Sequence, residues 1–341
     1  MKAARVVDGR LSIVDLAVPE PGPDQALVRI SSAGVCHSDL HLARGDWGGL
    51  VQSGVLGHEA IGVVEGLGVG ADRFVNQGDR VILGLGGTGG GYWCGGCEYC
   101  LGGSPRHCAH GKGIMGTFAE HFAVYAPSLV KLPDELSDLE APLACGGLTA
   151  YGAVKKLFKY HVRPGLPVAV IGAAGGLGHY AVQIASNFGY EVVGVDVGSD
   201  RLDFVRSIGA SVAVEPDEAV SAVESMGGVG AALVFTAKMA GFGLGLKMLR
   251  KGGLFVAVGL PPTDEGNIQI NPFEFFFKDP TLIYSAVGTV QDMRELVDLA
   301  VKGKVHSHVS RVGPLTELDT IFDELQASRY LGRAVINDLA N

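Results

Sequence analysis

The 341-residue sequence has few charged residues, and acidic residues outnumber basic ones. Charged residues make up 18% of the chain, and 27 lysines and arginines stand against 36 aspartates and glutamates, which gives a net charge of -9. Such a chain repels polyanions on average, so we expect no nucleic acid among its partners. Hydrophobic residues nevertheless reach 47%, which excludes intrinsic disorder and suffices for sizeable cores without disulfides.

The sequence also lacks a stretch that would cross a membrane or direct export. The longest uncharged segment, 164–190, contains Pro167, several glycines and scattered polar residues. A buried strand, a glycine turn and a helix explain this pattern better than a membrane span. Asp8 and Asp15 interrupt the N-terminal region where a signal peptide would be apolar. We therefore expect a cytoplasmic protein without membrane contacts, whose cysteines are metal ligands or reactive thiols before they are disulfides.

Two kinds of strand pattern divide the chain. Residues 1–146 contain short strands of alternating polarity, whereas residues 147–287 contain compact apolar runs with helix-like segments, such as 179–188 and 199–208, between them. The apolar runs are 168–171, 191–195, 231–235 and 254–258. Alternating buried strands and helices predict a doubly wound α/β domain with a parallel sheet. We expect this dinucleotide-binding domain at 147–287, and a β-rich domain formed by 1–146 and 288–341.

Four of the six cysteines lie in one glycine-rich loop with the spacing C-x2-C-x2-C-x7-C. They are Cys94, Cys97, Cys100 and Cys108. Four thiolates on such a loop can surround a tetrahedral ion, and Zn²⁺ accepts that geometry at about 2.3 Å per sulfur. Thiolates also suit iron–sulfur clusters, but this run lacks their usual spacings. Since protein ligands would fill all four positions, we interpret the loop as a structural zinc site.

The two remaining cysteines, Cys36 and Cys145, are far apart in sequence. Each alone would be an ordinary buried residue, but together with His58 they form the three-ligand set that catalytic zinc uses, with one position open. A zinc ion held in this way polarises an alcohol or carbonyl oxygen. Asp39 is a candidate to anchor the second ring nitrogen of His58.

A glycine-rich turn follows the apolar run 168–171 and opens a helix. Its glycines are Gly172, Gly175, Gly176 and Gly178. The strict pattern G-x-G-x-x-G is not met, because Ala173 holds the first position. The strand, turn and helix are nevertheless the context that a dinucleotide requires, since the glycines let the pyrophosphate approach the helix N-terminus.

The acidic residue expected in this fold stands at the end of the next apolar run. Asp196 would bind the adenosine ribose, and a carboxylate there favours a free 2′-hydroxyl over a 2′-phosphate. We therefore predict NAD in preference to NADP as the cofactor. Arg201 lies five residues further on and could soften that preference.

Taken together, these motifs resemble the zinc-dependent medium-chain alcohol dehydrogenases, close to their tetrameric microbial branch. The family's zinc signature, G-H-E-x2-G-x5-G-x2-[IVSAC], is matched from Gly57 to Ala71, and GVCHSDLH, the four-cysteine loop and LACGGLTAYGAV occupy further family positions in the right order. The resemblance implies a Rossmann domain plus a β-rich GroES-like catalytic domain. It also implies reversible hydride transfer between NAD(H) and a primary or secondary alcohol, with an aldehyde or ketone as the other partner.

The resemblance further assigns residue roles. It implies two zinc ions per chain, the catalytic one bound by Cys36, His58 and Cys145 with Glu59 behind the metal. Ser38 would bond the substrate oxygen, and a relay through the cofactor ribose would reach His41 at the surface.

The same resemblance gives the contacts of the cofactor and the expected assembly. His37 and Arg333 would lie near its phosphates and Thr149 near its nicotinamide, and Gly176 and Leu177 would complete the glycine turn. We expect a homo-oligomer, a tetramer in preference to a dimer.

Two loops depart from the family pattern. Residues 84–93 form a longer and more glycine-rich segment, and residues 109–116 a shorter one. Both flank the expected substrate entrance, so the resemblance does not identify the substrate. Trp47, Leu85 and Trp93 could line an apolar pocket there, or Trp93 could pack only against the cysteine loop.

Three alternatives make different demands on the sequence. A zinc-independent NADPH quinone or enone reductase of the same superfamily would need neither the cysteine–histidine–cysteine set nor Asp196. A polyol dehydrogenase usually carries glutamate where this chain has Cys145. A non-catalytic dinucleotide-binding protein would not need Ser38 and His41 beside the metal ligands.

Overall fold

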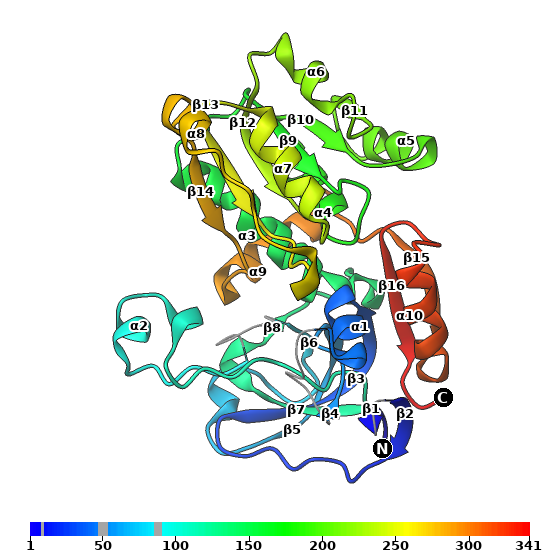
Figure 1. Ribbon diagram of the computed structural model, residues 1–341. Coiled ribbons are helices and arrows are strands. Elements are labelled where there is room, and N and C mark those ends of the chain that lie inside the picture. Colours follow the sequence, from blue (N-terminus) through cyan, green and yellow to red (C-terminus); the bar gives the residue numbers. More distant parts are fainter. Residues whose placement is uncertain (8–9, 47–53, 85–90) are drawn as a thin grey trace. The chain divides into compact units, whose positions relative to one another are not determined.

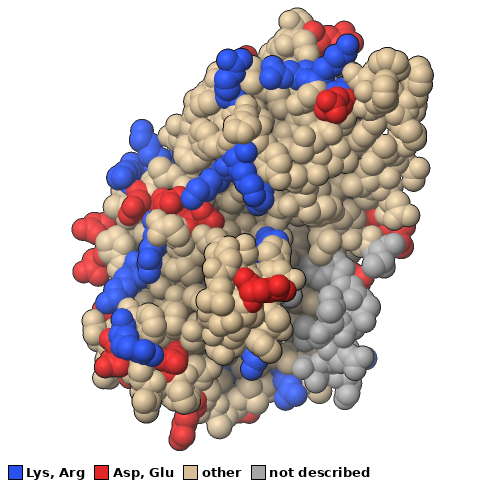
Figure 2. Space-filling view, turned by 90° about the vertical axis from the view of Figure 1, so that its left-hand side faces the viewer, with Lys and Arg blue, Asp and Glu red and all other residues tan. Residues whose placement is uncertain are grey.

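The computed structural model describes residues 1–7, 10–46, 54–84 and 91–341 (Figure 1). These residues form two compact units. Unit 1 comprises Met1–Leu148 and Val287–Asn341, and unit 2 comprises Thr149–Ala286. No helix in the described ranges combines the length and the apolar character needed to span a membrane. On the face drawn in Figure 2, acidic and basic side chains are interspersed among uncharged ones.

Unit 1 is built on two sheets. The smaller sheet has the order β2-β1-β4, and the larger one the order β15-β16-β3-β5-β6-β8, with β7 also pairing with β3. The strands are β1 (Lys2–Val7), β2 (Arg10–Asp15), β3 (Gln25–Val35), β4 (Gly54–Val55), β5 (Ala60–Leu67), β6 (Arg80–Leu83), β7 (His121–Tyr125), β8 (Val130–Lys131), β15 (Val309–Pro314) and β16 (Arg333–Asp338). The alternating polarity predicted from the sequence places one face of β3 in a core with buried residues such as Val28 and Phe118.

Helices of unit 1 are α1 (His37–Arg44), α2 (Glu98–Leu101), α9 (Val290–Val301) and α10 (Leu318–Gln326).

The C-terminal segment of the chain returns to unit 1 and pairs with its N-terminal strands, which matters for the site described below. Strand β16 pairs antiparallel with β3, with Val335 opposite Gly34, and β3 pairs antiparallel with β5, with Ala33 opposite Ala60. This register places the start of β16, the end of β3 and the start of β5 side by side.

Unit 2 contains a six-stranded parallel sheet with the strand order β11-β10-β9-β12-β13-β14. The strands are β9 (Pro167–Ile171), β10 (Glu191–Val195), β11 (Val212–Val214), β12 (Val229–Val234), β13 (Leu249–Ala257) and β14 (Thr281–Tyr284). This order is that of the doubly wound dinucleotide-binding fold. The predicted fold class is therefore confirmed.

The helices of unit 2 alternate with these strands. They are α4 (Gly178–Asn187), α5 (Ser199–Ser207), α6 (Ala219–Glu224), α7 (Met239–Met248) and α8 (Pro272–Lys278), while α3 (Gly146–Lys159) precedes β9. All five residues of β9 and all six of β12 are buried, as the continuous apolar runs require. Strands β11 and β14 were not predicted, because they are only three and four residues long.

Candidate functional site

Cys36 lies at the junction between β3 and α1, and the first turn of the helix fixes its position. The Cys36 backbone N–H donates to Asp39 Oδ2 at 3.1 Å, from the third residue of the helix. This side-chain contact satisfies a donor at the helix N-terminus and holds the turn. Cys36 itself is buried.

The other oxygen of Asp39 reaches a second loop. Asp39 Oδ1 accepts the Gly57 backbone N–H at 3.2 Å and lies 2.9 Å from His58 Nδ1. Asp39 is completely buried, and His58 almost so. Since Nδ1 is committed to the carboxylate, His58 presents Nε2 to any metal ion. The predicted anchoring residue therefore contacts both the Cys36 turn and the His58 ring.

Cys145 joins this pair from a third segment, directly before α3. One ligand atom from each of Cys36, His58, Glu59 and Cys145 lies within 4.8 Å of the others. Two sulfurs and one imidazole nitrogen are the donor set of a catalytic zinc ion that keeps one position open. The four side chains brought together here thus fit the metal that the sequence suggested.

Glu59 lies beside these donors and is held by an arginine from the end of the chain. Arg333, at the start of β16, forms a buried ion pair with Glu59 Oε2 and donates to the Val35 carbonyl at 3.0 Å. Burial raises the pKa of Glu59 to about 7, although the Arg333 guanidinium opposes the shift. Glu59 Oε1 is buried and has no hydrogen-bond partner among the described residues. An acceptor oxygen of this kind, next to three metal donors, favours a cation at the site.

The sequence did not reveal the contact between Arg333 and Glu59. The two residues are 274 positions apart, and only the pairing of β16 with β3 brings them together. Arg333 was expected near the cofactor phosphates. In this structure its side chain lies within unit 1, behind the candidate metal ligands.

Helix α1 carries the three residues expected to contact the cofactor or move a proton. Ser38 is half-buried and His37 is exposed, both in the first turn, next to Cys36. His41 lies one turn further, with its Nδ1 2.8 Å from Asp46 Oδ2 and its side chain 13% exposed. Asp46 was not predicted. The nearby Gly45, which ends α1 in the left-handed conformation with φ of 75°, could have signalled that the chain turns back there.

The four-cysteine loop forms a second cluster. The Sγ–Sγ distances are 3.6 Å for Cys97–Cys100, 3.9 Å for Cys97–Cys108 and 3.5 Å for Cys94–Cys108. Sulfurs bound tetrahedrally to zinc at about 2.3 Å lie ~3.8 Å apart, so these distances suit one zinc ion. All six cysteines of the chain are free of disulfides.

Backbone donors favour the thiolate form of two cysteines in the loop, Cys97 and Cys108. Cys108 Sγ accepts the N–H groups of Cys94 at 3.3 Å and His110 at 3.4 Å, and these bonds lower the pKa of Cys108 despite its desolvation. The pKa of Cys97 falls to about 6, chiefly because backbone N–H groups of Cys100 and Ala109 bond its sulfur. Since the thiolate is the metal-binding form, this loop is suited to hold a cation.

Trp93 packs edge-on against Tyr125, with ring centroids 5.1 Å apart, and Tyr92 contacts the same ring at 4.9 Å. These aromatics line a cavity of about 630 Å³ at the base of the cysteine loop, together with Asp24 and Lys112. Trp47 and Leu85, the other residues expected to line an apolar pocket, lie outside the described residues.

In unit 2, the glycine turn joins β9 to α4. Gly172 has a φ of 81°, a left-handed conformation that favours glycine. In the strict pattern the first glycine would stand one position later, where this chain has Ala173. A Cβ at Gly178 would lie 2.0 Å from the Gly172 carbonyl oxygen, so the helix can begin here only with glycine. Gly175, Gly176 and Leu177 complete the turn between these two positions, and none of the three is fully buried.

Asp196 connects this turn to the end of β10. Its Oδ2 accepts the Ala174 N–H at 2.8 Å and its Oδ1 accepts the Val197 N–H at 2.9 Å. Arg201, in the first turn of α5, places its Nη1 3.6 Å from Asp196 Oδ1. Thr149 is buried on α3. The structure thus brings Asp196 and Arg201 together beside the glycine turn.

Comparison with known proteins gives matches over nearly the whole chain. The family model described as Alcohol dehydrogenase GroES-like domain matches residues 22–134, and that described as Zinc-binding dehydrogenase matches residues 176–302. An alcohol dehydrogenase of Geobacillus stearothermophilus is 38% identical and covers 98% of this chain and 99% of its own.

Solved structures also resemble this chain over nearly its whole length. The alcohol dehydrogenase of the hyperthermophilic archaeon Aeropyrum pernix has a TM-score of 0.88 at 33% identity, with 98% of this chain and 99% of that one covered. The acetophenone reductase of Geotrichum candidum, solved in complex with NAD, has a TM-score of 0.85 at 27% identity, with 100% and 98% covered.

Proposed function

The chain belongs to the zinc-dependent medium-chain alcohol dehydrogenases, and we propose that its reaction centre is built on Cys36, His58 and Cys145. The protein is an NAD-dependent oxidoreductase that interconverts a small-molecule alcohol and the corresponding aldehyde or ketone. The observation that supports this proposal is the largely buried set of two sulfurs, one imidazole and one carboxylate within 4.8 Å of one another. A zinc ion bound there supplies polarisation of the alcohol or carbonyl oxygen.

The residues around this set have distinct tasks. Asp39 orients His58 and the Cys36 turn through three hydrogen bonds, so the donor atoms are held before a ligand arrives. Glu59 has one oxygen held by Arg333 and the other without a hydrogen-bond partner among the described residues, so it can serve as a transient ligand beside the other donors. Cys94, Cys97, Cys100 and Cys108 hold a second, structural zinc ion.

The proton of the alcohol leaves through α1. Ser38 follows Cys36 by two residues. The turn that positions the Cys36 thiolate therefore also positions the Ser38 hydroxyl to accept the proton of the alcohol. His41, whose Nδ1 lies 2.8 Å from Asp46 Oδ2 and whose side chain is partly exposed, would pass that proton to solvent, and the ribose hydroxyls of a bound cofactor would supply the link between Ser38 and His41. A histidine is suited to exchange this proton with water near neutral pH.

The glycine turn of unit 2 would hold the nucleotide, with the N-terminus of α4 for the pyrophosphate and Asp196 for the adenosine ribose. Gly172, Gly175, Gly176, Leu177 and Gly178 form that turn. Thr149 would pack near the nicotinamide, and His37 and Arg201 would lie toward the phosphates, whereas Arg333 holds Glu59 instead. Because Asp196 carries a negative charge where NADP has its 2′-phosphate, the enzyme prefers NAD.

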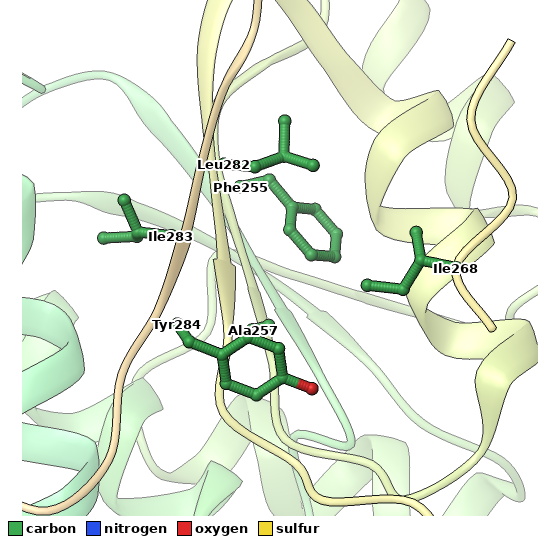
Figure 3. A pocket seen from close by; sticks show the side chains of 6 residues that line it. All are labelled: Phe255, Ala257, Ile268, Leu282, Ile283 and Tyr284. Atoms are coloured by element: carbon green, nitrogen blue, oxygen red, sulfur yellow. The ribbon is translucent and has the colours of Figure 1, made fainter.

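The protein forms a homo-oligomer in the cytoplasm, a tetramer in preference to a dimer. Support for self-association comes from the edge of unit 2, where β14 ends the sheet. On neighbouring α8, Phe273 and Phe276 are 72% and 79% exposed. A cavity of about 150 Å³ opens beside β14, lined by Phe255, Ala257, Ile268, Leu282, Ile283 and Tyr284 (Figure 3). An exposed apolar face next to an edge strand is typical of a surface covered by another subunit.

Metal content and activity test the function together. We expect two zinc ions per chain, and oxidation of a panel of primary and secondary alcohols with NAD⁺ that is lost on zinc removal. One ion or none, or iron in place of zinc, would contradict the two-site assignment.

Size-exclusion chromatography with light scattering tests the oligomeric state. Phe276→Asp places a charge on the exposed face of α8 and should dissociate the oligomer.

A further inference from the structure

Two carboxylates end neighbouring strands of unit 2. Strands β10 and β11 pair in parallel, with Val195 opposite Val214. The residues that follow are Asp196 and Glu215, so both acidic side chains stand at the carboxyl edge of the sheet. In an open α/β sheet this is the edge at which ligands bind.

Both carboxylates bond the same turn. Asp196 Oδ1 accepts the Val197 N–H at 2.9 Å, and Glu215 Oε1 accepts the Gly198 N–H at 2.7 Å. Gly198 has a φ of 90° and caps α5, a helix of nine residues. Successive backbone N–H groups at such a turn, beside a helix N-terminus, form a concave site for an anion. In this protein the carboxylates of Asp196 and Glu215 supply the negative charge at that site.

The turn is also the place where the two forms of the cofactor differ. In this fold the 2′-oxygen of the adenosine ribose lies at the acid that ends the second strand, here Asp196. A 2′-phosphate would therefore need the N–H donors and the cation of this turn. Glu215 already uses the Gly198 N–H, and Arg201 lies 3.6 Å from Asp196.

We propose that Glu215 is a second residue that determines the preference for NAD over NADP. It keeps the 2′-phosphate out in two ways, by occupying a backbone donor and by adding a negative charge beside the phosphate position. Glu215 is half-buried, so its carboxylate remains close enough to solvent to face a bound nucleotide. This inference rests on the proposed NAD-dependent function and concerns only the choice between the two nucleotides.

Two substitutions separate the charge from the hydrogen bond. Glu215→Gln keeps an acceptor for Gly198 but removes the charge, and Glu215→Ala removes both. Glu224→Gln makes the same chemical change at an exposed position at the end of α6 and serves as the control. The probes are 2′,5′-ADP and 5′-AMP, titrated calorimetrically into the full-length protein, with kcat/KM for NADP⁺ and NAD⁺ as the second measurement.

We expect Glu215→Gln to tighten 2′,5′-ADP binding on the order of tenfold, with 5′-AMP affinity changed less than about twofold. Glu215→Ala should gain at least as much for 2′,5′-ADP, and the ratio of kcat/KM for NADP⁺ over NAD⁺ should rise in parallel. The control variant should match the wild type. Adding Asp196→Gly to Glu215→Gln should increase the gain further.

The inference is overturned if neither Glu215→Gln nor Glu215→Ala binds 2′,5′-ADP more tightly than the wild type. It is also overturned if both nucleotides weaken equally in the Gln and Ala variants, since Glu215 would then only support the turn. Failure of the proposed function gives a different result, because the wild type would then bind neither 5′-AMP nor NADH.

Discussion

Asp39 Oδ1 lies 2.9 Å from Nδ1 of the candidate metal ligand His58, and both side chains are buried. The same carboxylate also accepts backbone N–H groups from Cys36 and Gly57. A single acidic side chain therefore connects two segments that each supply a ligand. Its charge favours the ring tautomer with Nε2 available, and it makes that nitrogen a better donor.

Asp39→Asn should weaken zinc binding or activity by about 10–100-fold, the usual range for a residue that orients a ligating histidine. Zinc affinity, measured by competition with a chelator, is the direct test. Asp72→Asn removes an exposed carboxylate from the same unit and should leave the affinity unchanged. Equal zinc affinity in Asp39→Asn and wild type would show that His58 does not depend on this contact.

The two cysteine clusters should respond differently to substitution. Cys145→Ser should lower kcat on the order of 10²–10³-fold or more, because stabilisation of charge in the transition state is lost, while the protein stays folded and binds NADH. Cys97→Ser should chiefly lower the melting temperature by several degrees, because a structural zinc contributes folding free energy. Turnover and thermal melts on both variants make the comparison. Lost activity with an unchanged melting temperature in Cys97→Ser would reverse the assignment of the two sites.

The proton path through α1 predicts unequal losses. Ser38→Ala should reduce kcat on the order of 10²-fold or more, in line with general acid–base contributions. His41→Gln should cost less, because water replaces it, and added buffer base should restore part of the rate. His306→Gln changes an exposed histidine elsewhere in unit 1 and should have no effect. A His41→Gln enzyme with the wild-type rate and pH profile from pH 6 to 8 would rule out the relay.

A surface cluster on the β-rich unit predicts a small dependence of stability on pH. Glu65 lies 2.6 Å from Arg29 Nε and 3.0 Å from His121 Nε2. Partial desolvation raises the pKa of Glu65, but the hydrogen bonds from Arg29 and His121 outweigh it, and the pKa is lowered overall. A carboxylate whose pKa is lower in the folded state stabilises above its ordinary pKa of 4.5, and that stabilisation is lost as the pH falls.

Glu65→Gln should therefore lower the melting temperature at pH 7 by about 1–3 °C, since exposed ion pairs contribute at most ~1 kcal/mol. The difference from wild type should shrink as the pH falls below 4.5, the ordinary glutamate pKa. Glu20→Gln, at an exposed position, is the control. A difference that stays constant from pH 7 to pH 4 would show that the ion pairs do not stabilise the fold.

Much of this protein could be predicted from sequence because the relevant residues are neighbours in the chain. The four cysteines of the loop lie within 15 consecutive residues, and their spacing alone indicated a tetrahedral site. Strands β9 and β12, and the buried parts of β10 and β13, are continuous apolar runs, which a parallel sheet covered on both faces requires. Asp39 could be paired with His58 once the motif around each was recognised.

Only the tertiary structure decided which distant side chains meet. The ion pair of Arg333 with Glu59 spans 274 residues, and the approach of Glu215 to Gly198 depends on β11 lying beside β10. Sheet register sets both contacts, and register depends on how all the strands pack at once. Spacing along the chain therefore determined which donor atoms this protein has, and packing between distant strands determined which charges surround them.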